Sequence, residues 1–348
     1  MRENSRLYTE DLRQAIYNSV GIDCLEGKSV LVTGATGTIG SFIVDELLEY
    51  NNTHTKQIKI FATSRNIKHL ENLFDNYKTE NLTYVEYDTL NNINFNFQVD
   101  YVIHNAGNAY PSAFKHYPVE TIMGNVNGTY NLLNYALSHG TKRFLYVSSG
   151  EVYGQEIIEK ESFDERYMGQ VEPMNARSCY PNSKRLCETL CSSFYTERHL
   201  ETLVVRPCHV YGPHLTNNDN RAHAQFIRNA LKGQKVVLKS RGQQMRSYCY
   251  IADCVSGIFT VLSKGKVNNA YNIANKKAVT TVQNLAKTIA LEVGSSVIFE
   301  NKILDSDSPI QKQVLNSEKL EELGWKGQYD IKTGIRHTLK ILQQSDEK

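Results

Sequence analysis

Short apolar runs alternate with longer helical stretches from Lys28 to about residue 206. The runs are rich in β-branched and aromatic residues, which is typical of strands buried on both faces of a sheet. Because helical stretches separate most of these runs, the pattern predicts an α/β fold with a doubly wound parallel sheet. The predicted strands are residues 29–33, 58–63, 83–87, 101–104, 144–148 and 203–206.

The pattern changes at both ends of this region. In residues 7–20, apolar side chains recur at helical spacing, which predicts an amphipathic helix packed against the main domain. After Pro207 the regularity loosens, and helical stretches begin at Ala252 and Ile331. We therefore expect a helical extension over residues 1–27, the sheet domain over 28–206 and a smaller domain over 207–348.

Composition narrows the class of protein. A chain of 348 residues with 41% hydrophobic residues can build one large domain or two fused ones. Its 39 basic and 37 acidic residues are scattered, so nucleic acid is not an expected partner. The seven cysteines form no disulfide framework or paired zinc motif, which favours a reducing, cytoplasmic location. No stretch approaches the ~20 apolar residues of a membrane helix, so no membrane partner is expected.

A strand, a glycine-rich turn and a helix follow one another over residues 29–50. Glycines in such a turn let the backbone approach a pyrophosphate, and the helix N-terminus that follows favours negative charge. An ordinary tight turn also uses glycine, but the flanking strand and helix favour a Rossmann-type dinucleotide site. The candidate cofactor residues of this turn are Gly34, Thr36, Gly37, Thr38, Ile39 and Gly40.

The end of the second predicted strand bears on which dinucleotide binds. An NAD-binding chain usually carries an acidic residue there for the ribose hydroxyls, whereas this chain has Ser64 and Arg65. These side chains favour a 2′-phosphate, so within NAD(P) the sequence leans towards NADP(H); Arg65 stacked on the adenine is the alternative. Further candidate cofactor residues follow the third and fourth predicted strands, namely Asp88, Asn105, Ala106 and Gly107.

Four side chains suggest redox chemistry at a hydroxyl group. Tyr180 and Lys184 are four residues apart, so a helix places them on one face. An ammonium beside a phenol lowers the pKa of the phenol, and Tyr180 then acts as base while the substrate carbon loses a hydride. Ser149 is expected to orient the reacting hydroxyl, and Glu151 to exchange a proton at a neighbouring carbon. A turn cap and a surface charge are their respective alternatives.

These motifs, taken in order, resemble the extended short-chain dehydrogenase/reductase superfamily from Lys28 to about Trp325. The matching segments are Thr33-Gly34-x-x-Gly37-x-x-Gly40, Asn125-Val126-x-Gly128, Ser149-x-Glu151-Val152-Tyr153-Gly154, Tyr180-x-x-x-Lys184, Arg206-Pro207-x-x-Val210-Tyr211-Gly212 and Leu323-Gly324-Trp325. The resemblance implies oxidation at a sugar carbon, usually C4, and a homodimer formed through helices 119–138 and 182–199. The cofactor contacts that it implies come from Asn125, Tyr180, Lys184 and Pro207.

Within the superfamily, two later segments are similar to UDP-glucuronate decarboxylases. They are Asn218-Asp219-x-Arg221 and Arg246-Ser247-Tyr248-x-Tyr250-Ile251-x-Asp253. The resemblance implies that Arg221 and Arg246 bind the nucleotide diphosphate, with a surface charge as the alternative for each. The remaining substrate-binding candidates are Arg177, His209 and Asp253. His209, His214 and His223 lack the spacing of metal ligands, so no metal is expected.

Three departures from related enzymes leave the reaction open. The 4,6-dehydratases often carry Asp before the Glu of the Ser-x-Glu motif, where this chain has Gly150. The decarboxylases carry an arginine before the Leu-Gly-Trp segment, where the nearest basic residue here is Lys312. Ser64 and Arg65 fit the decarboxylases poorly, whereas NADP use together with such a motif is similar to the GDP-mannose dehydratases.

The sequence therefore predicts NAD(P)-dependent modification of a nucleoside-diphosphate sugar through a transient keto-sugar. Decarboxylation or dehydration is the first prediction for the reaction. The product is expected to serve surface polysaccharide or glycan precursor synthesis. A net NADPH-dependent ketoreductase or an epimerase is the alternative, because neither reaction needs the two groups that are missing. From another class, a non-catalytic cofactor-binding protein also remains, although Tyr180 and Lys184 argue against it.

Overall fold

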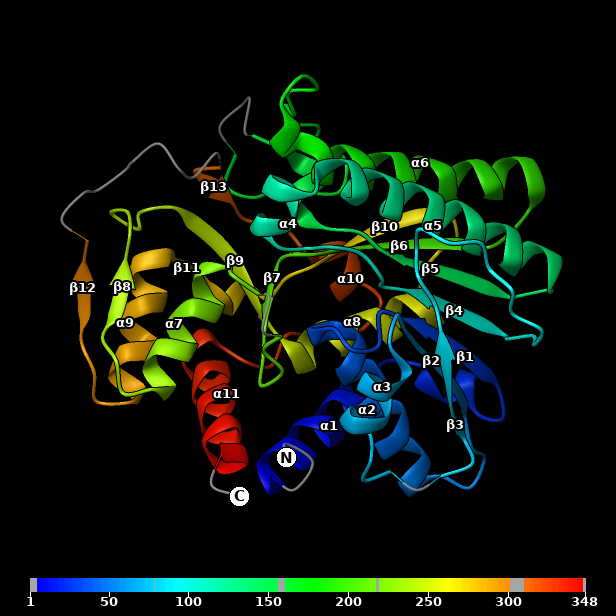
Figure 1. The fold of residues 1–348 in the computed structure, drawn as a ribbon, viewed down its shortest axis with the longest axis horizontal. Coiled ribbons are helices and arrows are strands. Elements are labelled where there is room, and N and C mark those ends of the chain that lie inside the picture. The colour runs from blue at the N-terminus through cyan, green and yellow to red at the C-terminus, as the bar shows by residue number, and fades with distance from the viewer. Residues whose placement is uncertain (1–4, 78, 156–159, 217–218, 301–309, 347–348) are drawn as a thin grey trace.

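A seven-stranded parallel sheet forms the central layer of the computed structural model (Figure 1). The structure describes residues 5–77, 79–155, 160–216, 219–300 and 310–346. Strands lie in the order β10-β6-β5-β4-β1-β2-β3, and every neighbouring pair is parallel. Their bounds are β1 Ser29–Thr33, β2 Lys59–Ser64, β3 Leu82–Glu86, β4 Tyr101–His104, β5 Arg143–Val147, β6 Thr202–Pro207 and β10 Asn269–Ile273.

The predicted α/β class and parallel sheet are confirmed, and six of the strands lie within one residue of their predicted bounds. The seventh strand, β10, was not predicted, because polar Asn269 and Asn272 interrupt its apolar run. Asn272 is fully buried, and its amide donates to the carbonyls of Phe163 and Asn316 at 3.0 and 2.9 Å. A buried amide is tolerated where such partners exist, and only the tertiary structure supplies them.

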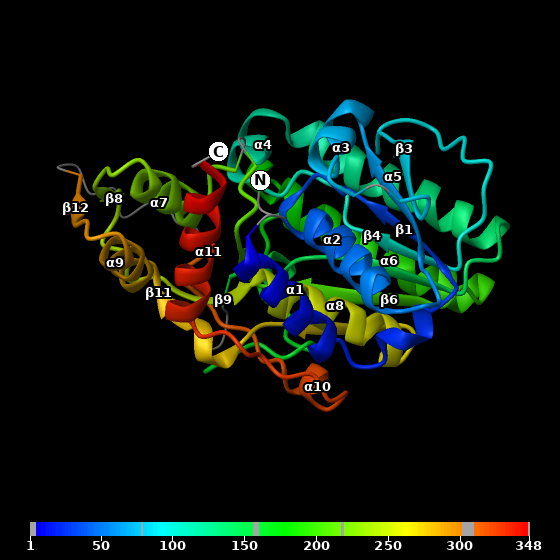
Figure 2. The same cartoon turned by 90° about the horizontal axis from the view of Figure 1, so that it is seen from below.

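Helices cover both faces of the sheet (Figure 1). On one face lie α5 (Pro118–Ser138) and α6 (Cys179–Arg198), packed side by side. On the other face lie α2 (Thr38–Thr53) and α8 (Ile251–Lys264). Figure 2 shows α1 (Arg6–Asn18) lying against α2 and α8, with α11 (Ile331–Asp346) beside it. The short helices α3 (Ile67–Leu73) and α4 (Pro111–His116) follow β2 and β4.

A smaller region is built from the C-terminal part of the chain. Its strands are β7 His209–Tyr211, β8 Val236–Leu238, β9 Met245–Tyr250, β11 Val279–Thr281, β12 Val297–Phe299 and β13 Lys312–Gln313, and its helices are α7 Ala222–Leu231 and α9 Val282–Glu292, with α11. The short helix α10 (Glu318–Glu321) packs instead against β10 and α8. Between these elements, α8 and β10 return to the large sheet. The chain after Pro207 therefore contributes to both regions and passes between them more than once. Among the described residues, no helix is long and apolar enough to span a membrane.

Helix α1 joins the two regions through one buried carboxylate. Asp11, 1% exposed, accepts hydrogen bonds from the hydroxyls of Tyr250 and Tyr329 at 2.6 and 2.9 Å. It also lies 2.8 Å from Nδ1 of His337 on α11. The predicted extension therefore packs on the sheet domain and also holds the C-terminal helix in place.

Glu46 on α2 should make stability depend on pH. Its side chain is fully buried against α1, where it accepts a hydrogen bond from Ser19 at 2.8 Å, and burial raises its pKa from 4.5 to about 8. The unfolded chain loses this proton near pH 4.5, so stability falls as pH rises from there to about 8. We expect Glu46→Gln to stabilise the protein above pH 8 by on the order of a few kcal/mol and to have little effect at pH 4.

Thermal unfolding at pH 4, 7 and 9 measures this difference. The exposed Glu10→Gln is the matched control and should shift Tm equally at each pH. A Glu46→Gln effect that is the same at pH 4 and pH 9 would show that folding does not raise the pKa of Glu46.

Candidate active site

The glycine-rich turn between β1 and α2 has the geometry of a phosphate-binding loop. Gly34 has a φ of +68°, and a Cβ there would lie 2.9 Å from the backbone of Ala106. A Cβ on Gly40 would lie 2.2 Å from the carbonyl oxygen of Gly34, so close packing of α2 on β1 requires this glycine. At Gly37, by contrast, a Cβ would meet only that oxygen, at 3.4 Å.

The protein itself therefore does not require glycine at Gly37, which is the N-cap of α2 and has no side-chain cap. A Cβ there would occupy the space in front of the free N–H groups of a 16-residue helix. That space is where a pyrophosphate binds in a fold of this kind. The residues present thus fit a dinucleotide, and the loop residues Thr36, Thr38 and Ile39 frame the same turn.

His214 supports this loop, and sequence reasoning had given it no role there. The hydroxyl of Thr38 donates to the backbone carbonyl of His214 at 2.9 Å, and Nε2 of His214 lies 3.1 Å from the carbonyl of Thr36. The segment after β7 therefore covers the phosphate loop. No sequence motif signals this contact, because 176 residues separate Thr38 from His214.

The other candidate cofactor residues end neighbouring strands at the same sheet edge. Ser64 ends β2, where its hydroxyl accepts from the N–H of Asn66 at 3.3 Å, and Arg65 beside it is exposed. Asp88 follows β3, and its carboxylate accepts from the N–H of Leu90 at 3.0 Å. Ser64 and Asp88 thus stabilise local turns, and their side chains remain partly exposed. The structure thus brings these residues to the crevice edge predicted for a Rossmann-type sheet.

The loop after β4 is held by hydrogen bonds to Thr33. Its hydroxyl accepts from the N–H groups of Asn105 and Ala106 at 3.1 and 3.0 Å. A Cβ on Gly107 would lie 2.6 Å from the amide oxygen of Asn125, so this loop approaches α5 closely. Asn125 itself is buried and donates to Ser183 on α6 at 2.9 Å. Asn125 therefore links the cofactor edge to the helix that carries the catalytic candidates.

Tyr180 and Ser149 meet at the base of the crevice. Tyr180 lies in the first turn of α6, is 6% exposed, and its ring stacks on that of Phe114 at 4.5 Å. Burial and the charge of Glu151 raise the pKa of Tyr180 to about 12, while the hydroxyl of Ser149 and the charges of Arg221 and Arg177 lower it. Ser149 also caps the turn that follows β5, accepting from the N–H of Glu151 at 3.2 Å. Ser149 therefore caps this turn and also lies beside the hydroxyl of Tyr180.

Lys184 lies one helical turn below Tyr180, as their spacing predicted. Its ammonium donates to the carbonyl of Val147 at 2.8 Å and lies 5.7 Å from the centre of the Tyr180 ring. Burial lowers the pKa of Lys184 to about 8. Below it, burial and the charge of Lys184 hold the pKa of His104 near 3, so this imidazole, 2.8 Å from Thr33, is neutral. A neutral ring beneath the ammonium avoids a second buried cation.

A buried polar network, which the sequence did not reveal, fixes the end of β5. Ser148 donates to Glu188 on α6 at 2.6 Å, and Arg206 on β6 forms a bidentate pair with the same carboxylate, closest at 2.6 Å. Arg206 also donates to the hydroxyl of Tyr153 at 2.9 Å. Pro207, a candidate cofactor residue, ends β6 beside this network. Because Ser148 is bonded to α6, the network fixes the position of the adjacent Ser149 relative to that helix.

Glu151 and Arg177 form a bidentate ion pair in the crevice. Both nitrogen–oxygen distances are 3.2 Å, and the two side chains are 23% and 34% exposed. The guanidinium also lies 4.8 Å from the centre of the Phe114 ring. The structure therefore brings the predicted second proton-transfer group and a predicted substrate-binding residue into direct contact.

Arg221 and His209 are the next two substrate-binding candidates. Arg221 is paired with buried Asp219 at 2.5 Å, and its charge acts on Tyr180. His209 and His223 both pack against Tyr248, and burial lowers the pKa of each, that of His223 to about 3. Their buried ring nitrogens Nδ1 of His209 and Nε2 of His223 have no hydrogen-bond partner among the described residues. Asn218, part of the motif that suggested Arg221, lies outside those residues.

Asp253, predicted to bind substrate, is held by protein groups in this structure. It is 1% exposed on α8, and its carboxylate accepts from the N–H groups of Gln328 and Tyr329 and from the amide of Asn275, at 2.9 to 3.0 Å. It therefore anchors the segment that leads into α11. Arg246, also buried, donates to the backbone carbonyls of Met245 and Gln311 at 2.9 and 3.1 Å, which ties β9 to β13.

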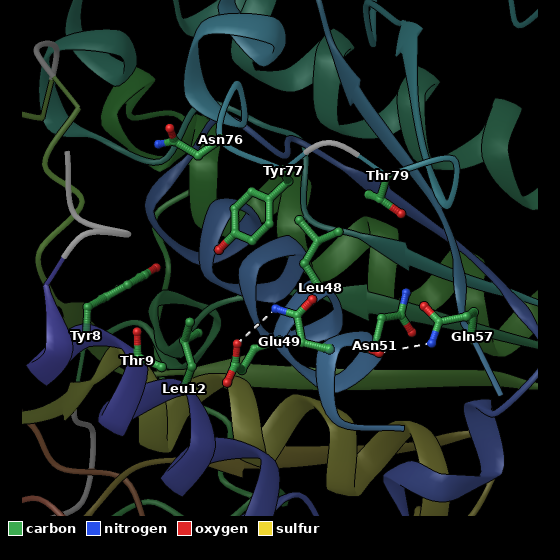
Figure 3. Close-up of a pocket in the computed structure, with 11 residues that line it drawn as sticks. Tyr8, Thr9, Leu12, Leu48, Glu49, Asn51, Gln57, Asn76, Tyr77 and Thr79 are labelled. Carbon is green, nitrogen blue, oxygen red and sulfur yellow. Dashed lines mark hydrogen bonds between the residues drawn. The ribbon is translucent and has the colours of Figure 1, made fainter. Parts of the chain in front are cut away.

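A separate cavity of about 620 Å³ lies away from this crevice (Figure 3). It is formed between α1, α2 and the loop after α3. Figure 3 shows Glu49 among amide side chains and the ring of Tyr77. The carboxylate of Glu49 is also paired with Arg13 at 2.7 Å. None of the candidate catalytic or cofactor residues lines it.

A nucleotide-binding sheet edge beside a Ser, Tyr and Lys constellation defines a short-chain dehydrogenase/reductase. The sequence profile of the NAD dependent epimerase/dehydratase family matches residues 30–274, and the chain belongs to that family. It is therefore an enzyme of the extended short-chain dehydrogenase/reductase type.

Within this family, the chain is similar in sequence to UDP-glucuronic acid decarboxylases. The chain is 32% identical over 312 residues to UDP-glucuronic acid decarboxylase 3 of Arabidopsis thaliana, covering 90% of this chain and 88% of that one. It is 29% identical to UDP-glucuronic acid decarboxylase 1 of Xenopus tropicalis, covering 92% and 73%. The alignment therefore spans nearly all of the chain.

Solved structures share the fold. The UDP-glucose 4-epimerase of Thermotoga maritima, solved with UDP-glucose, has a TM-score of 0.77 at 23% identity, covering 91% of this chain and 99% of that one. The dTDP-glucose 4,6-dehydratase of Bacillus anthracis, in complex with NAD, has a TM-score of 0.73 at 22% identity, covering 92% and 98%. These likenesses confirm the Rossmann-type architecture.

Proposed function

We propose that this enzyme decarboxylates a nucleoside-diphosphate hexuronate, with UDP-glucuronate as the first candidate. The observation that carries the proposal is the Glu151–Arg177 pair beside Tyr180, because it supplies a proton-transfer group and a cation next to the base. The similarity to UDP-glucuronic acid decarboxylases over 90% of the chain supports the same reaction. Dehydration is the second candidate, and Glu151 supports it, but Gly150 offers no acid for the leaving hydroxyl.

The first step is oxidation of the sugar at C4. Tyr180 takes the proton of the C4 hydroxyl, and Ser149 holds that oxygen in place by a hydrogen bond. The loop of Gly34, Gly37 and Gly40 would hold the pyrophosphate of a dinucleotide, whose nicotinamide would supply a reversible acceptor for the C4 hydride. Because burial raises the pKa of Tyr180 to about 12, the base requires positive charge nearby. The charges of Arg221 and Arg177 lower this pKa, and the ammonium of Lys184 lies 5.7 Å from the ring centre.

The second step follows from the new ketone. A carboxylate at C6 is β to the C4 carbonyl, so the C5–C6 bond breaks, carbon dioxide leaves, and its electron pair moves through C5 to the C4 oxygen. Tyr180 and Ser149 stabilise that oxygen, and Glu151 controls the proton that is added to C5. Tyr180 then returns its proton to the C4 oxygen, and with the hydride that a bound dinucleotide would supply back to C4 the product is a nucleoside-diphosphate pentose.

We extend the proposal to the cofactor preference and to the biological role. Ser64 and exposed Arg65 at the end of β2 support a preference for NADP(H) within an NAD-dependent family. A nucleoside-diphosphate pentose is an activated donor, so we propose a role in surface polysaccharide or other glycan precursor synthesis.

Mass spectrometry of the products tests the reaction and the cofactor together. Purified enzyme is incubated with UDP-glucuronate, UDP-glucose and the corresponding GDP- and dTDP-sugars, each with NAD+ or NADP+. Loss of carbon dioxide from a uronate is the expected result, with faster turnover when NADP+ is supplied. Loss of water from a neutral hexose would instead establish a dehydratase, and equal rates with both cofactors would remove the proposed preference.

We also propose a homodimer formed through α5 and α6. Apolar side chains on one stripe of α5 are exposed, including Val119 at 65%, Met123 at 42% and Tyr130 at 47%. Such a stripe on two packed helices favours burial against a second copy. Met123→Glu is expected to give a monomer by light scattering, whereas Tyr17→Glu, at an exposed position on α1, leaves the dimer intact. A wild-type monomer at micromolar concentration would contradict this assembly.

A further inference from the structure

Arg177 lies where it can exchange one carboxylate for another. Its planar guanidinium packs over the Phe114 ring at 4.8 Å, and that ring stacks on the Tyr180 ring at 4.5 Å with an interplanar angle of 20°. The aromatic layer fixes the direction of the guanidinium fork, which points at both oxygens of Glu151. The fork is thus preorganised for a carboxylate one ring away from the catalytic phenol.

The existing pair with Glu151 is not a tight one. Both hydrogen bonds are 3.2 Å long, whereas strong charge-assisted bonds are about 2.7–2.9 Å. Both side chains are also partly exposed to solvent, at 34% and 23%, which weakens an ion pair. A second carboxylate can therefore compete for the guanidinium at little cost.

Other cations near the crevice are engaged with groups that the chemistry does not use. Arg221 binds Asp219, Arg246 binds backbone carbonyls, and Lys184 donates to the carbonyl of Val147. Lys312, which is near the position where decarboxylases carry arginine, donates to the carbonyl of Lys160. Arg177 differs, since its partner is the proposed proton-transfer group itself.

We propose that Arg177 is the specificity-determining residue that recognises the carboxylate of a hexuronate, and that binding of this carboxylate displaces Glu151. The proposal rests on the proposed decarboxylase function and names the residue that selects its substrate class. Before substrate binds, Arg177 holds Glu151 away from proton transfer. The substrate carboxylate takes the guanidinium, and Glu151 becomes free to act at C5. A neutral hexose has no carboxylate, so the Glu151–Arg177 pair stays intact when it binds.

The exchange predicts that removing the charge of Glu151 tightens substrate binding. Binding is measured by isothermal titration calorimetry on cofactor-loaded enzyme, with Tyr180→Phe in every variant so that no substrate is consumed. Glu151→Gln is expected to tighten UDP-glucuronate binding several-fold, because the uronate then has no competitor, and to leave UDP-glucose binding unchanged. Arg177→Gln is expected to weaken UDP-glucuronate binding about tenfold or more, with UDP-glucose within about twofold.

Two further variants exclude indirect effects. The double variant Glu151→Gln/Arg177→Gln should lose the gain of Glu151→Gln, since both act on one exchange. Arg166→Gln is the matched control, because Arg166 is paired with Asp164 but its side chain is 92% exposed, and it should change neither affinity. Cofactor affinity is measured in each variant, and Arg177→Lys replaces Arg177→Gln if the latter fails to bind cofactor.

The outcomes separate this inference from the proposed reaction. Unchanged or weaker UDP-glucuronate binding in Glu151→Gln overturns the exchange, as does an equal loss for both sugars in Arg177→Gln. The mass-spectrometric assay on enzyme with intact Tyr180 tests decarboxylation separately. Selective uronate binding through Arg177 without release of carbon dioxide would support the exchange while rejecting the decarboxylase.

Discussion

Tyr180→Phe is expected to lower kcat by about 10²–10⁴ while nucleotide-sugar binding and folding are retained. Phe keeps the ring that stacks on Phe114 at 4.5 Å, and it removes only the hydroxyl that accepts the substrate proton. The hydride step should therefore fail even when substrate and cofactor are bound.

Steady-state rates and single-turnover absorbance of the reduced nicotinamide measure this effect. Tyr195→Phe, further along α6, removes a hydroxyl from the same helix and should leave kcat unchanged. If Tyr180→Phe retained nearly full activity, Tyr180 would not be the base. If wild-type and variant were both inactive but bound cofactor equally, the non-catalytic alternative would be favoured.

Gly37→Ala and Gly40→Ala should separate cofactor binding from folding. A methyl group at Gly37 meets only the carbonyl of Gly34 at 3.4 Å, so the protein should fold normally. The methyl would, however, occupy the approach to the N-terminus of α2, and we expect cofactor affinity to fall by about 100-fold. At Gly40 the methyl would lie 2.2 Å from that carbonyl, so a loss of about 3 kcal/mol in stability is expected.

Thermal unfolding without cofactor and fluorescence titration with NAD+ and NADP+ distinguish the two variants. Gly37→Ala should keep the wild-type Tm and lose affinity, whereas Gly40→Ala should lose Tm even before cofactor is added. Full cofactor affinity in Gly37→Ala would mean that the pyrophosphate binds away from this helix N-terminus.

Local pattern was sufficient for the elements of the sheet domain. Strands buried on both faces need continuous apolar runs, so the six runs marked their strands to within one residue. The strand–glycine–helix signature marked the loop at Gly34, Gly37 and Gly40 because its requirements are local. Strand β10 was not predicted, because its buried Asn272 is stabilised by partners far away in the chain.

The candidate site divides in the same way. The spacing of Tyr180 and Lys184 predicted a shared helix face, which follows from helix geometry alone. The pairing of Glu151 with Arg177 joins residues 26 positions apart across two different turns, so no periodicity reports it. The three protein donors that hold Asp253 could not be predicted either, because a carboxylate in a motif looks the same in the sequence whatever binds it.

The sequence by itself determined the fold class, the order of the strands along the chain and the residue types available for redox chemistry. Those properties depend on the side-chain pattern within a few residues. The tertiary structure alone decided which charges meet, which carboxylates are buried and which helices face each other. Hydrogen bonds such as those from Ser148 and Arg206 to Glu188 join separate elements, and their energies depend on burial that only packing creates.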